Sequence, residues 1–320
     1  MAGGDRESAG PLKMSIRDEL TKTLPARETV LTIGVFDGVH LGHQHLMSKL
    51  KEKSREAGLL SGVVTFNWHP KALLAPHAEL PYLTSMEERI ELIQDLGVDH
   101  VVVLSFTNEL AQLTAREFVR LLKEYLGMRR LVIGPDFALG QRREGNADVL
   151  RSLGQEFDFA VDVIPPMMIG EQVVSSTAIR QGLAEGDVEN IPRMLGRRFR
   201  LSGTVVPGNH RGGKLLGFPT ANLSVPKSHV RPADSIYFTL AHLNNAVYRA
   251  VTSIGVRPTF DPGERTIETY ILDFNGDLYG RELTIEFVSR LRDEMKFETP
   301  DALKAQMESD VTIARALPIE

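Results

Sequence analysis

Three histidines in the first part of the chain lie in a pattern suited to binding phosphate. The segment reads GVFDGVHLGHQHL over residues 34–46, after an apolar run and at the start of an amphipathic one. His40 and His43 are three positions apart, so both can face one anion at a helix N-terminus, where unpaired N–H groups favour phosphate. A metal site and simple helix-start polarity are the alternatives, but no carboxylate or Cys stands at ligand spacing. The motif therefore indicates an anion site, with His45 facing elsewhere.

A second chemical signal is a glycine-rich segment later in the chain. It reads GTVVPGNHRGGKLLGFPTANL over residues 203–223. Its glycines permit close approach of the backbone to phosphate, although a hairpin in a barrel would also explain them. Thr220 and Asn222 are two apart on an extended segment, so both side chains point the same way. A hydroxyl and an amide oxygen suit Mg²⁺, which takes oxygen ligands and nucleotide phosphates.

Glu268 is an acidic residue in an otherwise apolar pattern. It lies in TIETYILDF, on the expected strand face of Tyr270, Leu272 and Phe274. A kinase that phosphorylates an alcohol needs a carboxylate to accept the proton or to orient the hydroxyl. Glu268 is a candidate for this base, and an edge-strand glutamate without a catalytic task is the alternative.

The elements around the histidines alternate between strand and helix. Short β-branched apolar runs predict strands buried on both faces, and the amphipathic stretches between them predict helices. Thr84 and Thr114 each precede a Glu by three positions, which is the capping-box spacing of a helix start. This alternation predicts a parallel α/β sheet that binds ligands at its carboxyl edge. The predicted strands are 29–35, 61–66, 100–104, 130–134 and 159–164, and the first predicted helix is 43–57.

The pattern changes within residues 186–197. Beyond them Gly, Pro and Asn become frequent, and short alternating strands replace the helices. In ELTIEF, for example, Leu283, Ile285 and Phe287 fall on one face. Short strands separated by turns predict a small antiparallel barrel, with a final helix over 300–316 packed across it. The predicted strands are 198–206, 235–243, 246–254, 266–274 and 282–287.

Composition narrows the class of protein. With 320 residues, 42% hydrophobic and 25% charged, the chain has material for two globular domains. The absence of Cys excludes disulfides, thiol catalysis and thiolate metal sites. The net charge of -5 argues against a basic nucleic-acid surface. No apolar run is long enough for a membrane span and no secretory h-region is present, so a cytoplasmic protein is expected.

The histidine motif resembles the HxGH signature of nucleotidylyltransferases, and in its longer form it is similar to prokaryotic FAD synthetases. Further matches follow in order, in TFNWHP (65–70), VIGPDFALGQRREGN (132–146) and VSSTAIR (174–180). The resemblance implies that the last of these holds ATP phosphates at a second helix start, a task that suits the fork of an arginine. The implied nucleotide or phosphate contacts are Gly34, Phe36, Asp37, Gly38, His40, Gly42, His43, Ser175, Ser176, Thr177 and Arg180, and the implied flavin contacts are His69, Pro70, Asp136 and Phe137.

The segment GFPTAN resembles riboflavin kinases, and the likeness continues through SIGVRPTF (253–260), TIETYILDF (266–274), DLYG (277–280) and LRDEMKF (291–297). It implies that Thr220 and Asn222 bind Mg²⁺ and that Glu268 is the catalytic base. The implied phosphate contacts are Gly208, Arg211, Gly213, Lys214 and Gly217, and the implied flavin contact is Arg292. The chain differs from the family patterns at Trp68, Leu139, Ser235, Ser253 and Tyr270.

Together the resemblances imply a bifunctional riboflavin kinase/FMN adenylyltransferase. ATP would phosphorylate riboflavin to FMN, and a second ATP would adenylylate FMN to FAD with release of pyrophosphate, both with Mg²⁺. The second step needs no general base because the attacking FMN phosphate is already anionic, so catalysis reduces to alignment and charge stabilisation. The implied organisation is a flexible segment over 1–28, the adenylyltransferase over 29–190 and the kinase over 196–320.

Three alternatives remain open from the sequence. One of the two activities could be silent, or the first domain could adenylylate another phosphorylated substrate such as a nicotinamide or pantetheine derivative. A non-catalytic flavin sensor or nucleic-acid regulator built on the barrel is the third. The expected partners are small molecules, namely riboflavin, FMN and ATP, without nucleic acid or membrane, and weak self-association is compatible with the sequence.

Overall fold

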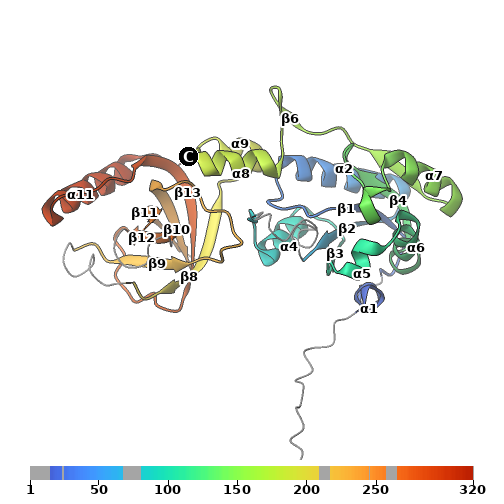
Figure 1. Cartoon of the computed structure of the whole chain (residues 1–320), viewed down its shortest axis with the longest axis horizontal. Helices are drawn as coiled ribbons and strands as arrows, with labels where there is room; N and C mark the ends of the chain where they lie inside the picture. The colour runs from blue at the N-terminus through green and yellow to red at the C-terminus, as the bar shows by residue number, and fades with distance from the viewer. Residues whose placement is uncertain are drawn as a thin grey trace, which may run out of the picture. The chain divides into compact units, whose positions relative to one another are not determined.

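The computed structural model describes residues 15–23, 25–67, 81–208, 217–244, 246–256 and 265–319. Within them the chain divides into two compact units, each of which is considered separately (Figure 1). The first unit comprises residues up to 36, 43–79 and 90–166, and the second comprises 37–42, 80–89 and 167–320.

The first unit is built on a five-stranded parallel sheet, as predicted. The strand order is β3-β2-β1-β4-β5, so the order reverses at β1. In open sheets of this kind ligands bind outside the carboxyl ends of the strands at that reversal, here beyond β1 and β4. The strands are β1 (Thr29–Ile33), β2 (Leu60–Phe66), β3 (His100–Leu104), β4 (Met128–Ile133) and β5 (Ala160–Val163).

One face of this sheet packs against three helices. All five residues of β1 are buried, and alternate residues such as Leu31 and Ile33 join Phe118 and Leu122 of a helix in one core. Burying a large apolar side chain contributes about 2 kcal/mol to the free energy of folding, so the packing on this face stabilises the sheet. The helices on it are α1 (Ile16–Thr21), α6 (Ala115–Leu126) and α7 (Ala147–Phe157).

One expectation about the N-terminal part of the chain needs correction. Residues 16–21, assigned to a flexible segment over 1–28, form α1, with Ser15 and Asp18 making a capping box. Ile16 and Leu20 are buried in the core of the first unit, so the expectation does not hold there. The remaining helices of this part are α2 (Leu41–Ala57), α4 (Met86–Asp95) and the short α5 (Asn108–Gln112).

The two predicted capping boxes have different outcomes. Thr114 and Glu117 form the expected reciprocal pair at the start of α6. The box at Thr84 is wrong, because Ser85 accepts the N–H of Glu88 and caps α4. The Thr84 hydroxyl instead donates to the carboxylate of Asp37 at 3.3 Å. A tertiary partner has therefore replaced the local cap.

The second unit contains a closed antiparallel barrel with the strand order β10-β11-β12-β9-β8-β13. A short hairpin and two helices precede it in the chain: β6 (Met168–Ile169), β7 (Gln172–Val173), α8 (Ser176–Glu185) and α9 (Ile191–Leu195). The barrel strands are β8 (Arg200–Val206), β9 (Thr220–Ser224), β10 (Ser235–Leu243), β11 (Ala246–Val256), β12 (Arg265–Ile271) and β13 (Glu282–Asp293). The prediction of a small barrel is confirmed.

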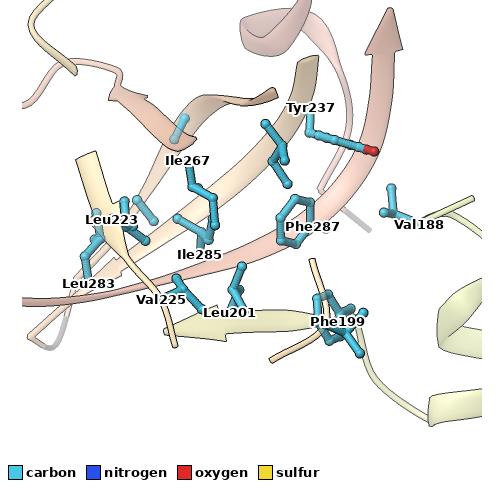
Figure 2. Close-up of a cluster of buried hydrophobic side chains, with 14 of the residues drawn as sticks. Val188, Phe199, Leu201, Leu223, Val225, Tyr237, Ile267, Leu283, Ile285 and Phe287 are labelled. Atoms are coloured by element: carbon cyan, nitrogen blue, oxygen red, sulfur yellow. The ribbon is translucent and has the colours of Figure 1, made fainter. Parts of the chain in front are cut away.

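Alternation along the strands fills the barrel. Leu283, Ile285 and Phe287 point inward and are fully buried, as the ELTIEF pattern predicted (Figure 2). The Phe287 ring meets Tyr237 edge-on at 5.2 Å. Ile179 and Leu183 of α8 belong to the same buried cluster, so this helix packs with the barrel. Because of this packing, α8 belongs to the second unit.

The predicted final helix is present as α11 (Pro300–Ala316). It lies against β11, and Ala314 packs with Phe238 and Leu240 on the outside of the barrel. Arg249 donates to the carbonyl oxygens of Ala314 and Leu317 at 2.7 and 2.8 Å, which satisfies the end of the helix. In the described part of the chain, no helix is long and apolar enough to cross a membrane.

Candidate active sites

The turn between β1 and α2 carries the histidine motif on an unusual backbone. Phe36, Gly38 and Val39 have φ values of 52°, 82° and 40°. A β-branched residue rarely adopts this left-handed region, and such strain is held at functional sites by the surrounding structure. A Cβ at Gly34 would lie 2.9 Å from the Phe36 ring, so this position requires glycine. Within the first unit, that ring meets His43 edge-on with centroids 5.2 Å apart.

Asp37 belongs to the same motif but contacts protein groups in the second unit. It is 2% exposed, and its carboxylate accepts the N–H groups of Leu83 and Thr84 at 2.9 and 3.2 Å. It also accepts a hydrogen bond from Arg180, and the Arg89 guanidinium lies 3.7 Å away. Asp37 therefore organises Arg180 and the backbone at residues 83–84.

His40 lies in a buried, electropositive environment. Its side chain is 5% exposed, and burial, reinforced by the charges of Arg180 and Arg197, lowers the pKa of His40 to about 4. The imidazole is therefore neutral at physiological pH and acts through hydrogen bonds. Gly42 allows this packing, because a Cβ there would lie 3.1 Å from the His40 ring. Arg197 also donates to the carbonyl oxygen of Gly38 at 2.9 Å, which fixes the turn.

The SSTAIR segment begins α8, as expected of a second helix start. The hydroxyl of Ser175 caps the helix by accepting the N–H of Ala178. Ser176 donates to the carbonyl oxygen of Asp37 at 2.9 Å. Thr177 is exposed in the first turn, and Arg180 is held by Asp37 and by the carbonyl of Pro81 at 2.8 Å. The second unit thus brings Asp37 to the start of α8.

A cavity of 500 Å³ lies in the first unit at the reversal of strand order. Gly34 and Val35, after β1, line it together with Asp136 and Phe137, after β4. The two predicted flavin contacts in this loop are thus together, and Leu139 lines the same space. The predicted contacts His69 and Pro70, and the departure Trp68, lie outside the described residues. The remaining lining is mostly apolar: Ile33, Phe66, Phe106, Leu110, Ala111, Phe118, Ala138, Gly140, Arg142 and Arg143.

Glu268 lies on the outer face of β12, directly opposite Asn222 of β9 and Ser253 of β11. The hydroxyl of Thr220 donates to its carboxylate at 3.4 Å. Only Tyr270 of the expected apolar neighbours shares this face of the strand, because β12 ends at Ile271. The structure therefore groups the predicted catalytic and metal-binding side chains on adjacent strands.

Two cavities of 330 Å³ each lie beside this cluster, and Thr220 lines both. One contains Glu268, Ser253, Tyr270 and Arg292, and Phe218 meets the Tyr270 ring edge-on there at 5.0 Å. The other is lined by residues of β8, β9, β12 and the segment after β12: Val205, Pro219, Ala221, Thr269, Ile271, Phe274, Asn275, Gly276, Asp277, Leu278 and Tyr279. The arrangement provides space for two molecules on either side of Thr220.

The expected flavin contact Arg292 is held in place by a buried carboxylate. Its guanidinium pairs with Asp310 of α11 at 2.7 Å, and the Asp310 side chain is only 3% exposed. Sequence reasoning missed Asp310, because nothing in the helix pattern marks an acid as buried. The departure Ser235 does not line this cavity and accepts a hydrogen bond from Arg290 at 2.8 Å.

The glycine-rich segment is only partly described. Gly208 lies against Asn222, whose Nδ2 would be 2.2 Å from a Cβ at that position. Gly217 has a φ of 79°, a conformation that suits glycine. The predicted phosphate contacts Arg211, Gly213 and Lys214 lie outside the described residues.

The donor set around Glu268 fits a magnesium ion. Thr220, Asn222 and Glu268 supply hydroxyl, amide and carboxylate oxygens on neighbouring strands, and Mg²⁺ usually takes one or two such ligands together with nucleotide phosphates. No group of three or more His, Cys, Asp or Glu side chains able to hold a metal ion is found among the described residues. The arrangement therefore fits a metal that arrives with a nucleotide.

The chain therefore combines a parallel α/β sheet that has a cavity at its strand-order reversal with a closed barrel in which Thr220 lines two cavities and Glu268 one of them. This combination is typical of a two-part enzyme for small molecules. A family model described as FAD synthetase matches residues 22–178. One described as riboflavin kinase matches residues 195–317.

Curated relatives match the chain over most of its length. A protein of Pseudomonas fluorescens named bifunctional riboflavin kinase/FMN adenylyltransferase is 38% identical, covering 91% of this chain and 93% of its own. Proteins of the same name from Escherichia coli K12 and Listeria monocytogenes are 36% and 34% identical, covering 91% and 90% of this chain and 93% and 91% of theirs. The chain therefore belongs to the family of bifunctional riboflavin kinase/FMN adenylyltransferases.

A solved structure agrees with this architecture. It comes from Streptococcus pneumoniae and is described as a macrolide-efflux protein. It matches with a TM-score of 0.85 and 32% identity, covering 93% of this chain and 97% of that one. The likeness extends through both units of the chain.

Proposed function

We infer that this chain converts riboflavin to FMN and then FMN to FAD, using one ATP in each step. The observation that carries the kinase assignment is the position of Thr220, which lines two cavities and donates a hydrogen bond to Glu268 in one of them. A phosphoryl transfer between two small molecules needs space for both of them, because the acceptor oxygen and the phosphate must approach in line. We assign the adenylyltransferase to residues 29–190 and the kinase to residues 196–320.

In the kinase step, we propose that riboflavin occupies the cavity with Tyr270 and Arg292. The oxygen of the ribityl 5'-hydroxyl bonds to the γ-phosphorus of ATP, and Glu268 accepts the proton of that hydroxyl. The bond from that phosphorus to the β–γ bridging oxygen breaks, and ADP leaves. Thr220 and Asn222 would hold Mg²⁺, which when bound neutralises the phosphate charge. Gly208 and Gly217 leave room for the phosphates, and Arg211, Gly213 and Lys214 are further proposed contacts from the family pattern.

In the adenylylation step, we propose that FMN occupies the cavity of the first unit. A phosphate oxygen of FMN bonds to the α-phosphorus of the second ATP, and the bond from that phosphorus to the α–β bridging oxygen breaks, so pyrophosphate leaves. We propose that His40, His43 and Arg180 stabilise the charge on the phosphates, and that Ser175 and Ser176 are further phosphate contacts. The depressed pKa of His40 supports a role as a neutral hydrogen-bond donor in the unliganded chain.

The kinase and adenylyltransferase assignments are tested by one time course. Purified protein with riboflavin, Mg²⁺ and excess ATP should give FMN first and FAD later, as separated by chromatography with fluorescence detection. Glu268→Gln should lose riboflavin phosphorylation and still convert supplied FMN to FAD. His43→Ala should show the opposite pattern. Loss of both activities in either folded variant would refute two independent sites, and FMN accumulating alone in the unaltered chain would favour a single-activity enzyme.

We further propose that the protein acts in the cytoplasm on small molecules, without nucleic-acid partners. Titration of labelled DNA and RNA at low salt should give no saturable binding, and the oligomeric state by light scattering would decide the question of weak self-association. Substrate profiling with phosphorylated nicotinamide and pantetheine compounds should give no turnover in the adenylylation step. Turnover of either would favour the broader nucleotidylyltransferase alternative.

A further inference from the structure

Two adjacent arginines line the cavity of the first unit, and no carboxylate in the described part of the chain pairs with either of them. Arg142 and Arg143 both contribute to the lining and both are exposed. Among the described residues neither forms an ion pair, and Arg143 donates only to the backbone carbonyl of Asp136 at 2.8 Å. Four other arginines of this unit are paired with carboxylates, namely Arg116 with Glu156, Arg129 with Glu28 and Asp158, Arg130 with Asp162, and Arg151 with Asp148. The arginines at the cavity are therefore available for an external anion.

The backbone under these arginines is held in a rare conformation. Arg142 and Arg143 have φ values of 53° and 60°. Side chains other than glycine seldom adopt this region, and two in succession persist only where the surroundings determine the loop. An unconstrained loop would relax or would carry glycine at these positions. The conformation thus points to a requirement for these side chains at this place.

The surroundings that hold the loop can be identified. Leu139 and Gly145 exchange backbone hydrogen bonds of 3.2 and 2.9 Å, which close the loop at its base. Gln141 donates to the carbonyl of Leu113 at 2.7 Å. The Glu144 carboxylate accepts the N–H of Ala115 at 2.8 Å, so the loop is fastened to the start of α6. Glu144 is thereby engaged with the backbone. Asp136 is the only acidic side chain in the described lining of the cavity.

The chemistry of the cavity divides into an apolar part and a cationic part. Phe66, Phe106, Phe118 and Phe137 supply aromatic surface for a flat ring. An arginine fork matches the oxygens of a phosphate monoester, and two forks can bind the oxygens that do not attack. A molecule with a flat apolar ring at one end and a phosphate monoester at the other fits both parts.

We propose that Arg142 and Arg143 bind the phosphate of the flavin substrate and thereby select FMN over riboflavin for adenylylation. The proposal rests on the adenylyltransferase function inferred above. Selection by phosphate prevents the apolar part of the cavity from being occupied unproductively by the unphosphorylated flavin, which has the same ring. The arginines also hold the attacking phosphate against the repulsion of the ATP phosphates, which is a positioning role.

The test compares two ligands that share the ring. Arg142→Gln should raise the KM for FMN roughly 10- to 100-fold, the loss expected for hydrogen bonds to a charged group. Lumiflavin, which carries a methyl group in place of the phosphoribityl chain and cannot be phosphorylated, should inhibit both forms with the same inhibition constant. Arg142→Lys keeps the charge but loses the planar guanidinium, so its KM for FMN should lie between those of the unaltered chain and Arg142→Gln. Arg151→Gln on α7 is the matched control and should leave all constants unchanged.

Three results would overturn the proposal. Equal weakening of FMN and lumiflavin would mean that the loop only shapes the ring cavity. A rise in the KM for ATP with an unchanged KM for FMN would mean that the arginines bind the nucleotide phosphates. Unchanged constants in both Arg142→Gln and Arg143→Gln would remove any role. The inhibition constant of lumiflavin reports whether the cavity of the first unit is folded in the variant. Absence of FAD formation by the unaltered chain would refute the underlying function instead.

Discussion

His40 provides a quantitative test of the electrostatics at the histidine motif. Burial and the charges of Arg180 and Arg197 lower the pKa of this residue from 6.5 to about 4. In the unfolded chain the imidazole regains its ordinary pKa, so between these two values the unfolded state binds a proton that the folded state does not. Stability from this group is therefore fully present above pH 6.5 and is lost as the pH falls toward 4.

The size of the effect follows from the two pKa values. They correspond to at most about 3 kcal/mol of unfolding free energy, of which about 2 kcal/mol is lost between about pH 7.5 and about pH 5. The imidazole is 5% exposed, so solvent screening takes little from this figure. His40→Asn removes the titration while it keeps a polar side chain of similar size.

The measurement is urea unfolding of both proteins at the two pH values, following the transition of the unit that contains His40. The unaltered chain should lose about 2 kcal/mol more than His40→Asn on acidification. A change of His45 to Asn, which lies in α2 five positions after His40, is the control for a histidine substitution as such. A direct titration of the His40 ring by NMR gives the pKa itself. Parallel pH dependences of the unaltered chain and His40→Asn would refute the reasoning.

Three further predictions address the other parts of the site. Arg292→Gln should raise the KM for riboflavin and leave the conversion of FMN to FAD unchanged. It should also lower stability by about 3 kcal/mol, because Asp310 is left buried without its partner. Gly140→Ala should destabilise the first unit by about 1–3 kcal/mol, since φ is 76° there and a Cβ would lie 2.5 Å from the backbone nitrogen of Ala115; a melting curve measures this. Chelation with EDTA should stop both reactions and added Mg²⁺ should restore them, whereas activity that survives chelation would remove the metal from the proposal.

The sequence predicted the framework well because the framework depends on periodicity. Unbroken β-branched runs predicted the buried strands of the parallel sheet, and all five are present. Strict alternation in ELTIEF predicted which side chains fill the barrel, and Leu283, Ile285 and Phe287 are fully buried. The capping box at Thr114 was also predicted, because both of its members belong to one helical turn. Interactions within one element are readable from local spacing.

Interactions between distant segments were not readable in this way. Thr84 has the local spacing of a cap, but its hydroxyl goes to Asp37, 47 positions away. Arg180 reaches the same carboxylate across 143 positions. The helix α1 was missed because only Ile16 and Leu20 mark its apolar face, too few for a periodic signal. The positive φ values at Arg142 and Arg143 had no sequence signal either, because glycine is absent there.

The burial of each proposed ligand-binding arginine explains whether it forms an ion pair with a carboxylate of the protein. Arg180 and Arg292 have side chains that are 14% and 18% exposed, and they pair with Asp37 and Asp310, each 3% exposed. A guanidinium that is poorly solvated in the absence of its ligand needs a counter-ion, because burying an unpaired charge costs free energy. Arg142 and Arg143 are exposed, so water can solvate them until the ligand arrives. The acids beside the buried arginines are therefore part of each proposed site, because they neutralise the guanidinium group before a ligand is bound.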